Sequence, residues 1–394
     1  MAYTLLNGVR VLEMALLAPD LVGMHLADLG AEVVKIEQPP DGDYLREIGG
    51  RRLAGLNLMH LRWNRGKKSV TLDLKRPQGQ RLLHRLVAAA DVFIDGLRPG
   101  AAARCAADWE TLSAVNPRLV YCSVSGAGAA GPYAALATHG VAYDAFAGLA
   151  PPASHADGSP RIPAYTPVGM LAAPLYAALA VCAALAQARA SGEGRRLEVA
   201  ELDAAASWQA EHLDATLNGV ASTIPDMTPA VRYQYYRTAD DQVVLFQASE
   251  RKFWKNFCTA VGREDLFAAK PGSLAGDHAR GDEALRAELA AIFRTRTRAE
   301  WVRFFIAHDV PGAPVYTADE LPADPHFAAR DLLFEQDHPI AGHLRLFGTP
   351  VKVAGERFAA APAPAPGEHT AEVLAGMLGL EPDEIERLRA DGVV

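Results

Sequence analysis

Basic side chains cluster in two short segments of the sequence and could bind an anionic ligand. The first is Asn64-Arg-Gly-Lys-Lys68, which places three positive charges before a predicted strand, Val70 to Leu74, that Lys75 closes. In the second, Arg98 and Arg104 flank a Pro-Gly turn just after another predicted strand. Basic residues at strand ends lie where open α/β sheets bind ligands. A solvated basic face is the simpler alternative, because charge alone does not identify a ligand.

Residues for other catalytic chemistries are sparse. His139 lies in a glycine-containing loop and could act as a base if a carboxylate cooperated, although a lone histidine is more often structural. Asp144 follows soon after, but in a helix that begins near Tyr143 it need not face His139. Cys105, which follows Arg104, is the one cysteine with a neighbour that could activate it. No H-x-x-x-H, H-x-H or C-x-x-C spacing occurs, so we expect no metal site.

A GxGxxG pattern occurs at Gly126, Gly128 and Gly131, after a predicted strand. Pro132 follows at once, and no acidic residue about 20 positions further on ends a second strand, as a dinucleotide-binding fingerprint requires. We interpret the pattern as a tight loop in which glycine lets the backbone turn or approach a ligand.

Composition excludes several classes of protein. With 39 Lys and Arg against 47 Asp and Glu, the net charge of −8 offers no general attraction to nucleic acid or to an anionic membrane. The 4 cysteines are scattered, which indicates reduced thiols and a cytoplasmic protein. Arg10 and Glu13 interrupt the first apolar run, so the N-terminus does not resemble a signal peptide.

The elements that must position these residues alternate between strand and helix, which predicts an α/β fold with a parallel sheet. An uncharged, Ala-rich helix from Leu171 to Ala186 is shorter than the roughly 20 residues that span a bilayer, so we expect it to be buried in the core. A helix is expected to follow Ala200 as far as about Leu217. The expected strands are Val9–Glu13, Glu32–Glu37, Val70–Leu74, Asp91–Asp95, Arg118–Val124, Arg195–Ala200 and Gln242–Gln247.

Several segments together resemble one known family. The sequence NRGKKSVTLDLK matches the family pattern NRGKxSxxLDLK, and an Ala-rich helix ends in Ser191-Gly-Glu-Gly194. On these motifs the chain resembles, over nearly its whole length, the class III CoA-transferases, the family of formyl-CoA transferase, carnitine CoA-transferase and α-methylacyl-CoA racemase. The other matching segments are Leu26–Glu37, Asn116–Ala134 and Gly367–Leu374.

The resemblance implies a fold and a ligand. It implies a Rossmann-like large domain (residues 1–220), a smaller α+β domain (221–330), and a return segment (331–394) that completes the large domain. It also implies two open-ring subunits that interlock as a dimer. The ligand would be coenzyme A or an acyl-CoA, as substrate and not as a resident cofactor. The CoA-binding positions implied by the resemblance are Arg65, Lys68, Leu72, Lys75, Gly96, Arg98, Arg104 and Cys105.

The chain departs from the family where the chemistry takes place. An aspartate that attacks the thioester usually stands where this chain has Met170, and no Asp or Glu occurs from Ala164 to Ala190. Gly96 stands where relatives place an Asn, and the segment at Leu17 lacks a Gln found in some transferases. The resemblance therefore implies a degenerate acyl site beside a retained nucleotide site.

Three functions remain open. The chain could be the non-nucleophilic subunit of a two-subunit CoA-transferase, with a homologous partner that carries the aspartate. It could instead move a proton α to a thioester, with His139 in the place of the racemase histidine. It could also bind CoA esters without catalysis. We expect the first, as a heteromer or a homodimer without nucleic-acid or membrane partners.

Overall fold

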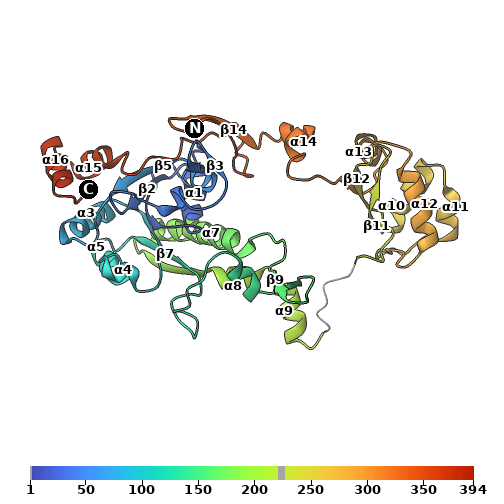
Figure 1. Cartoon of the computed structure of the whole chain (residues 1–394), viewed down its shortest axis with the longest axis horizontal. Helices are drawn as coiled ribbons and strands as arrows, with labels where there is room; N and C mark the ends of the chain where they lie inside the picture. The colour runs from blue at the N-terminus through green and yellow to red at the C-terminus, as the bar shows by residue number, and fades with distance from the viewer. Residues whose placement is uncertain (1, 221–226) are drawn as a thin grey trace. The chain divides into compact units, whose positions relative to one another are not determined.

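The structure is a computed structural model that describes residues 2–220 and 227–394, and it divides into two compact units. The first combines the chain up to Asp214 with the segment from Leu332 to Val394, and the second comprises Ala215–Asp331. Both termini belong to the first unit (Figure 1). The expected domain boundary at 220 adjoins residues 221–226, which lie outside the described residues.

A parallel six-stranded sheet forms the centre of the first unit. Its strands lie in the order β10-β7-β6-β1-β2-β5, and every neighbouring pair is parallel. Parallel strands need crossover connections and are buried on both faces, which explains the apolar runs that predicted them. The α/β fold with a parallel sheet is therefore confirmed. The strands are β1 (Arg10–Ala15), β2 (Glu32–Glu37), β5 (Lys67–Thr71), β6 (Val92–Gly96), β7 (Val120–Ser125) and β10 (Arg195–Ala200).

Helices cover both faces of this sheet. On one face, α1 (Asp20–Asp28) and α7 (Val168–Ser191) enclose one apolar core with the sheet. On the other face, α3 (Pro77–Ala88) shares a second core with α15 (Thr370–Leu378) and α16 (Pro382–Ala390). The end of the chain thus completes a core that the N-terminal half begins, as the neighbouring labels in Figure 1 show.

Two predicted elements have different bounds in the structure. Strand β5 begins at Lys67 and not at Val70, because the Lys67 ammonium is buried against the Glu13 carboxylate at 2.5 Å. The expected helix after Ala200 is two helices, α8 (Glu201–Ser207) and α9 (Ala210–Leu217). The remaining elements up to Leu217 and after Asp331 are η1 (Tyr44–Arg46), β3 (Arg52–Leu53), β4 (Leu56–Asn57), α2 (Leu58–Trp63), α4 (Ala101–Arg104), α5 (Trp109–Val115), α6 (Val141–Phe146), β8 (Ala153–Ser154), β9 (Pro160–Arg161), β14 (Leu333–His338) and β15 (Gly342–Phe347).

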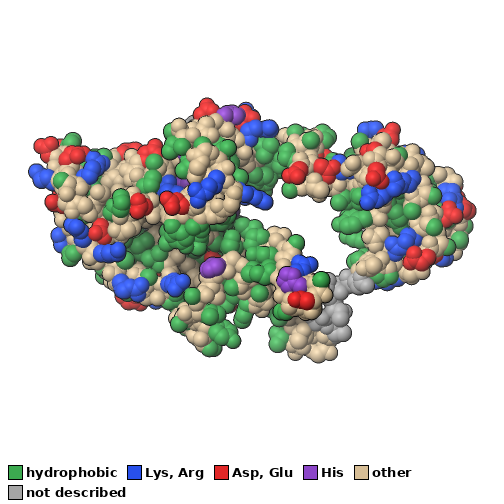
Figure 2. Space-filling model, in the orientation of Figure 1, with side chains coloured by type: hydrophobic (Ala, Val, Ile, Leu, Met, Phe, Trp, Pro, Cys, Tyr) green, Lys and Arg blue, Asp and Glu red, His purple; other side chains and the backbone are tan. Residues whose placement is uncertain are grey.

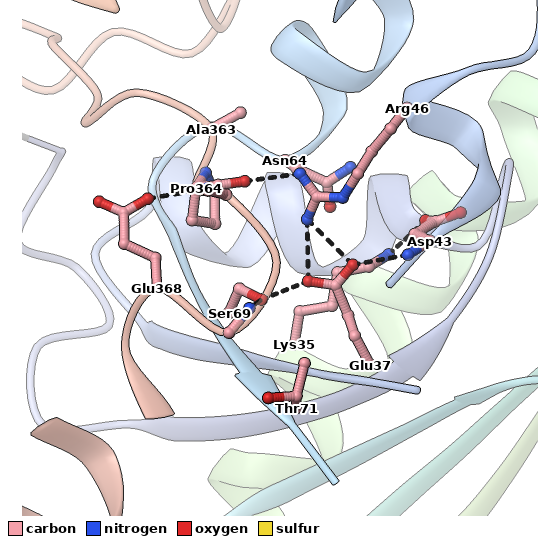
Figure 3. Close-up of polar contacts among 12 residues, drawn as sticks. Lys35, Glu37, Asp43, Arg46, Asn64, Ser69, Thr71, Ala363, Pro364 and Glu368 are labelled. Atoms are coloured by element: carbon pink, nitrogen blue, oxygen red, sulfur yellow. Dashed lines mark hydrogen bonds and ion pairs between the residues drawn. The ribbon is translucent and has the colours of Figure 1, made fainter. Parts of the chain in front are cut away.

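Buried charges join the sheet to the returning segment (Figure 3). The Glu37 carboxylate accepts two hydrogen bonds from Arg46 Nη2, each 2.9 Å long. Arg46 Nη1 donates to the carbonyl of Pro364 at 2.7 Å, and the backbone N–H of Gly367 donates to Ser69 Oγ at 2.8 Å. Since a buried charge is tolerated only when it is paired and hydrogen-bonded, these contacts hold the return segment in one position.

A second buried cation lies beside this network. Burial disfavours the charged form of Lys35, but the carboxylates of Asp20 and Asp43 outweigh burial and raise the lysine pKa above its ordinary value. Burial and the charge of Arg46 lower the pKa of His60 to about 3, so its ring is neutral. The network is therefore held by carboxylates and by lysine and arginine cations.

The second unit has its own core. An antiparallel sheet in the order β11-β12-β13 packs with helices around aromatic side chains, including the pairs Phe246–Phe257 at 4.6 Å and Phe293–Trp301 at 4.7 Å between ring centroids. Its elements are β11 (Tyr233–Arg237), β12 (Val243–Gln247), α10 (Arg251–Ala260), α11 (Glu264–Ala269), α12 (Glu283–Phe293), α13 (Arg298–Ala307), β13 (Gly312–Pro314), η2 (Leu321–Ala323) and α14 (Pro325–Ala329).

Helix α7 has one buried and one exposed apolar face. In the described part of the chain it is the one helix with the length and composition of a membrane span, yet half of its most apolar stretch is buried. Ala173 and Ala177 are buried in the core with the sheet, whereas Leu175 and Leu179 are 53% and 67% exposed. Hydrophobic side chains accordingly gather on the surface near α7 (Figure 2). The expectation of a core helix holds for one face only.

Candidate functional site

Three of the expected anion-binding side chains lie near the carboxyl edge of the parallel sheet. Lys75 comes soon after β5, and Arg98 and Arg104 follow β6. All three side chains are exposed. Arg104 Nη1 donates to the carbonyl of Gly100 at 3.1 Å. Open α/β sheets bind ligands at this edge, so these cations could meet an anionic ligand there.

Cys105 directly follows one of these cations, Arg104, and is half-buried. Burial raises the pKa of its thiol; the charge of Arg104 reduces that rise, the Asp95 carboxylate adds to it, and Lys75 reduces it slightly. Lys75 and Arg104 both follow strands of the same sheet, at the edge where open α/β sheets bind ligands. A thiol with a raised pKa is a poor nucleophile, so Cys105 fits a contact residue better than a reactive one.

Arg65 and Lys68 do not lie at this edge. Arg65 precedes β5 and Lys68 is its second residue, so both lie near the amino end of that strand. The expected strand began at Val70, whereas β5 begins at Lys67, so their segment lies at the edge of the sheet opposite Lys75.

Both side chains are also paired with carboxylates. Arg65 is 1% exposed, and its Nε and Nη2 atoms donate to Asp28 at 3.0 and 2.6 Å. The Lys68 ammonium lies 2.7 Å from Glu32 and 2.8 Å from Glu372. In this arrangement the two cations stabilise the fold, and Arg65 has no exposed surface for a phosphate.

Leu72 and Gly96 occupy tightly packed positions. Leu72 is buried in the core that α3 covers. A Cβ atom at Gly96 would lie 2.6 Å from Pro19 Cβ and 2.7 Å from Ala15 Cβ, closer than atoms of this kind can approach. The local packing of β1 and α1 therefore explains why this chain has glycine at the end of β6.

Met170 and Leu17 belong to one apolar cluster, although 153 positions separate their numbers (170 − 17). Met170 stands in the first turn of α7, and Leu17 follows β1 with a left-handed φ of 62°. Both are half-buried and pack against Leu21, Met24 and neighbouring side chains. Two positions at which the sequence analysis noted lost polar groups thus form a common apolar surface.

His139 and Asp144 do not form an acid–base pair. His139 is exposed, and its carbonyl accepts a hydrogen bond from the backbone N–H of Ala142 at 3.4 Å. Asp144 is fully buried, and its Oδ1 accepts from the backbone N–H of Gly169 at 3.1 Å. The carboxylate therefore faces the first turn of α7 and is not paired with the histidine.

A second buried acid lies near Asp144 and was not singled out by the sequence analysis. Glu201, the first residue of α8, is 2% exposed. Burial raises the pKa of Glu201 to about 7, the Tyr143 hydroxyl opposes that rise, and the charge of Asp144 adds to it. Asp144 Oδ2 and Glu201 Oε2 are buried and have no hydrogen-bond partner among the described residues. No local pattern could have identified the pair, because α6 and α8 meet only in the tertiary structure.

The described residues contain no group of three or more His, Cys, Asp or Glu side chains that could hold a metal ion. What the chain offers is three exposed cations at the carboxyl edge of the sheet, an apolar surface at Leu17 and Met170, and two buried acidic residues that lie against Gly169 in the first turn of α7. This set can bind an anionic ligand and exchange a proton. Position 170, however, carries a thioether and no carboxylate that could act as a nucleophile.

Comparison with known proteins identifies similar chains. Residues 6–370 match the model of CoA-transferase family III. The succinyl-CoA–D-citramalate CoA-transferase of Chloroflexus aurantiacus is 31% identical over 99% of this chain and 98% of that protein. The beta subunit of the succinyl-CoA–L-malate CoA-transferase of the same organism is 29% identical over 99% of this chain and 98% of its own. A crystal structure of a mutant of Rv3272 from Mycobacterium tuberculosis has a TM-score of 0.78 at 31% identity, covering 94% of this chain and 98% of that one.

Proposed function

The chain belongs to CoA-transferase family III, and we propose that it binds a CoA thioester at the carboxyl edge of its parallel sheet. Lys75, Arg98 and Arg104 would receive the phosphates, and Cys105 would lie beside them. The observation that carries this proposal is that three exposed cations, Lys75, Arg98 and Arg104, follow β5 and β6 at that edge, in a chain whose net charge is −8. Cations gathered against the overall charge favour a specific anionic ligand.

The further proposal is that this chain is the non-nucleophilic subunit of a two-subunit CoA-transferase. Met170 would occupy the place of the nucleophilic aspartate, and a thioether cannot form an acyl anhydride or hold CoA as a thioester. A relative named as the beta subunit of a succinyl-CoA–L-malate CoA-transferase supports a subunit role. The partner would be a homologous chain that carries the aspartate.

The exposed face of α7 supports an assembly. Leu171, Leu175 and Leu179 recur every four residues along the helix and are 42%, 53% and 67% exposed. An apolar stripe of this kind on a long helix marks a contact surface, because water is a poor environment for it. We propose that a second chain of the same fold covers this face, in an interlocked dimer or heterodimer in the cytoplasm.

Calorimetry and chemical trapping test the proposal together. The purified chain should bind CoA, acetyl-CoA and succinyl-CoA, with affinity that weakens as salt is added. With radiolabelled succinyl-CoA and hydroxylamine, the chain alone should form no acyl adduct between Ala164 and Ala190. Adding a homologous chain that carries the aspartate should produce adducts on that partner and start CoA transfer. Robust transfer by the unaltered chain alone would reject the subunit role.

The proton-transfer alternative gives a different result. Solvent deuterium would enter the α-carbon of a 2-methylacyl-CoA, and His139→Ala would abolish that exchange. A chain that binds CoA esters but shows neither exchange nor transfer with any partner would be a binding protein.

A further inference from the structure

Three short helical segments meet around two buried carboxyl groups. Asp144 comes from α6 and Glu201 from the start of α8, and both side chains are at most 2% exposed. The first turn of α7 lies against them, since Gly169 donates its backbone N–H to Asp144 Oδ1. Met170, the next residue, packs in one apolar cluster with Tyr143 and with Leu202, the neighbour of Glu201.

Each carboxyl group has an oxygen that no described residue satisfies. Asp144 Oδ2 and Glu201 Oε2 are both buried without a hydrogen-bond partner among those residues. Leaving a buried polar atom unsatisfied costs free energy, and native structures keep few such atoms. Two of them, on residues that both lie against Gly169 in the first turn of α7, indicate a place where a hydrogen-bonding ligand belongs.

The groups around Glu201 allow it to be neutral near physiological pH. From α6 it faces the Tyr143 hydroxyl and the Asp144 carboxylate, and no basic group contributes to its titration. From β10, Glu198 accepts a hydrogen bond from the backbone N–H of Ala129, and Asp203 on α8 itself is exposed. Burial raises the pKa of Glu201 to about 7, so the neutral acid is well populated at pH 7 and below.

We propose that Glu201, held beside Asp144, is the hydrogen-bond donor for the acyl group of a CoA thioester bound at the start of α7, and that it donates as the neutral carboxylic acid. This inference rests on the proposed binding of CoA thioesters. Asp144 is a positioning residue, because its charge helps to keep the proton on Glu201 and its Oδ1 atom is used by Gly169.

Met170 provides the route to this donor. It is half-buried, unbranched and packed against both apolar clusters of the site. A methionine side chain changes rotamer at low cost, so an entering acyl group can displace it and reach the carbonyl-binding oxygen behind. A donor for the acyl oxygen is useful in a chain that has no acid at position 170.

The test compares CoA with acetyl-CoA, which differ only in the acyl group. Dissociation constants of both are measured by calorimetry from pH 6 to pH 8.5. We expect the ratio of the acetyl-CoA constant to the CoA constant to rise by about tenfold in all as pH passes through the Glu201 pKa and then to level off, since only the neutral acid donates. Taking the ratio removes the ionisation of the CoA phosphates.

Three variants complete the test. Glu201→Gln keeps an N–H donor and loses the titration, so its ratio should stay low and constant with pH. Glu201→Leu loses the donor, so its ratio should be constant with pH and about tenfold above that of the unaltered chain at pH 6, while CoA binding is unchanged, and that unchanged binding reports an intact fold. Asp203→Asn, on the exposed side of the same helix, should behave as the unaltered chain.

The outcomes separate this inference from the proposed function. If neither ligand binds, both are rejected. If CoA and acetyl-CoA bind with a ratio that does not change with pH, or if Glu201→Gln keeps the pH dependence, the role of Glu201 is rejected while CoA binding stands.

Discussion

The Asp144 carboxylate accepts a hydrogen bond from the backbone N–H of Gly169 at 3.1 Å. This contact joins α6 to the first turn of α7, one residue before Met170. The four N-terminal N–H groups of a helix lack internal acceptors, and Pro167 at the N-cap of α7 supplies no side-chain acceptor. Asp144, which belongs to α6, therefore caps the N-terminus of α7 by accepting one of its unsatisfied N–H groups.

Replacing this acceptor should destabilise the chain. Asp144→Ala removes the hydrogen bond to Gly169, and we expect the free energy of unfolding to fall by about 1–2 kcal/mol, as for other lost helix caps. Urea denaturation measures the change. Asp203→Ala, at an exposed acid on α8, is the matched control and should change stability by less than about 0.5 kcal/mol. Equal effects of the two substitutions would contradict the capping role.

Glu201 should make stability depend on pH. Its pKa is about 7 in the folded chain and near 4.5 when unperturbed, so the unfolded chain loses this proton at lower pH than the folded chain does. The proton stabilises the fold fully below pH 4.5, and that contribution disappears as pH rises through 7. Through this group the free energy of unfolding should fall by about 3 kcal/mol as pH rises from 4.5 to 7.

Denaturation at pH 5 and pH 8 checks this effect. The unaltered chain should be less stable at pH 8 than at pH 5 because of Glu201. Glu201→Gln carries no titrating group at this position, so its free energy of unfolding should differ less between the two pH values. A variant with the same pH dependence as the unaltered chain would show that Glu201 titrates normally.

Arg65 and Lys68 should differ sharply in their contribution to stability. Arg65→Met leaves the buried Asp28 carboxylate without its partner, which should cost about 3–5 kcal/mol. Lys68→Met removes half-exposed ion pairs with Glu32 and Glu372 and should cost no more than about 1 kcal/mol. Thermal unfolding distinguishes the two. If Lys68→Met were the more damaging, the assignment of Arg65 to the core would be wrong.

The glycine at the end of β6 should not accept a side chain. Gly96→Ala puts a Cβ atom 2.6 Å from Pro19 Cβ, and we expect a loss of about 1–3 kcal/mol from overpacking. Gly376→Ala is the control. Gly376 lies in α15, and a Cβ atom at this position would have no other atom within 4 Å. That substitution should stabilise the helix by up to about 1 kcal/mol. Chemical denaturation of both variants measures the contrast.

CoA affinity should depend on the cations at the carboxyl edge of the sheet. Lys75→Ala and Arg104→Ala should each weaken CoA binding about tenfold and reduce its salt dependence, since each removes one charge from the proposed phosphate site. Arg118→Ala is the matched control, because this exposed arginine precedes β7 at the opposite edge. Calorimetry at two salt concentrations compares them. Equal losses in all three variants would mean that CoA responds to net charge alone.

Much of the fold could be predicted from the sequence. Strand β2 has the predicted bounds, Glu32–Glu37, and β10 has the predicted bounds, Arg195–Ala200. The apolar residues and turn residues that define each of these strands lie within a few positions of it in the sequence. The alternation of strand and helix along the chain implied the parallel sheet. The family could also be recognised, because its motifs are short and continuous.

The tertiary structure alone decided the rest. A charged Lys67 could enter the sheet because Glu13, far away in the chain, supplies its counter-ion, and β5 therefore begins three residues before the predicted strand. Leu17 and Met170 were each noted in the sequence, but their common apolar cluster follows from the packing of α7 beside the end of β1. The nearness of Asp144 and Glu201 has the same origin: an unpaired carboxylate and a raised pKa result from burial by remote elements, which leaves no mark on the residues next to either acid in the sequence.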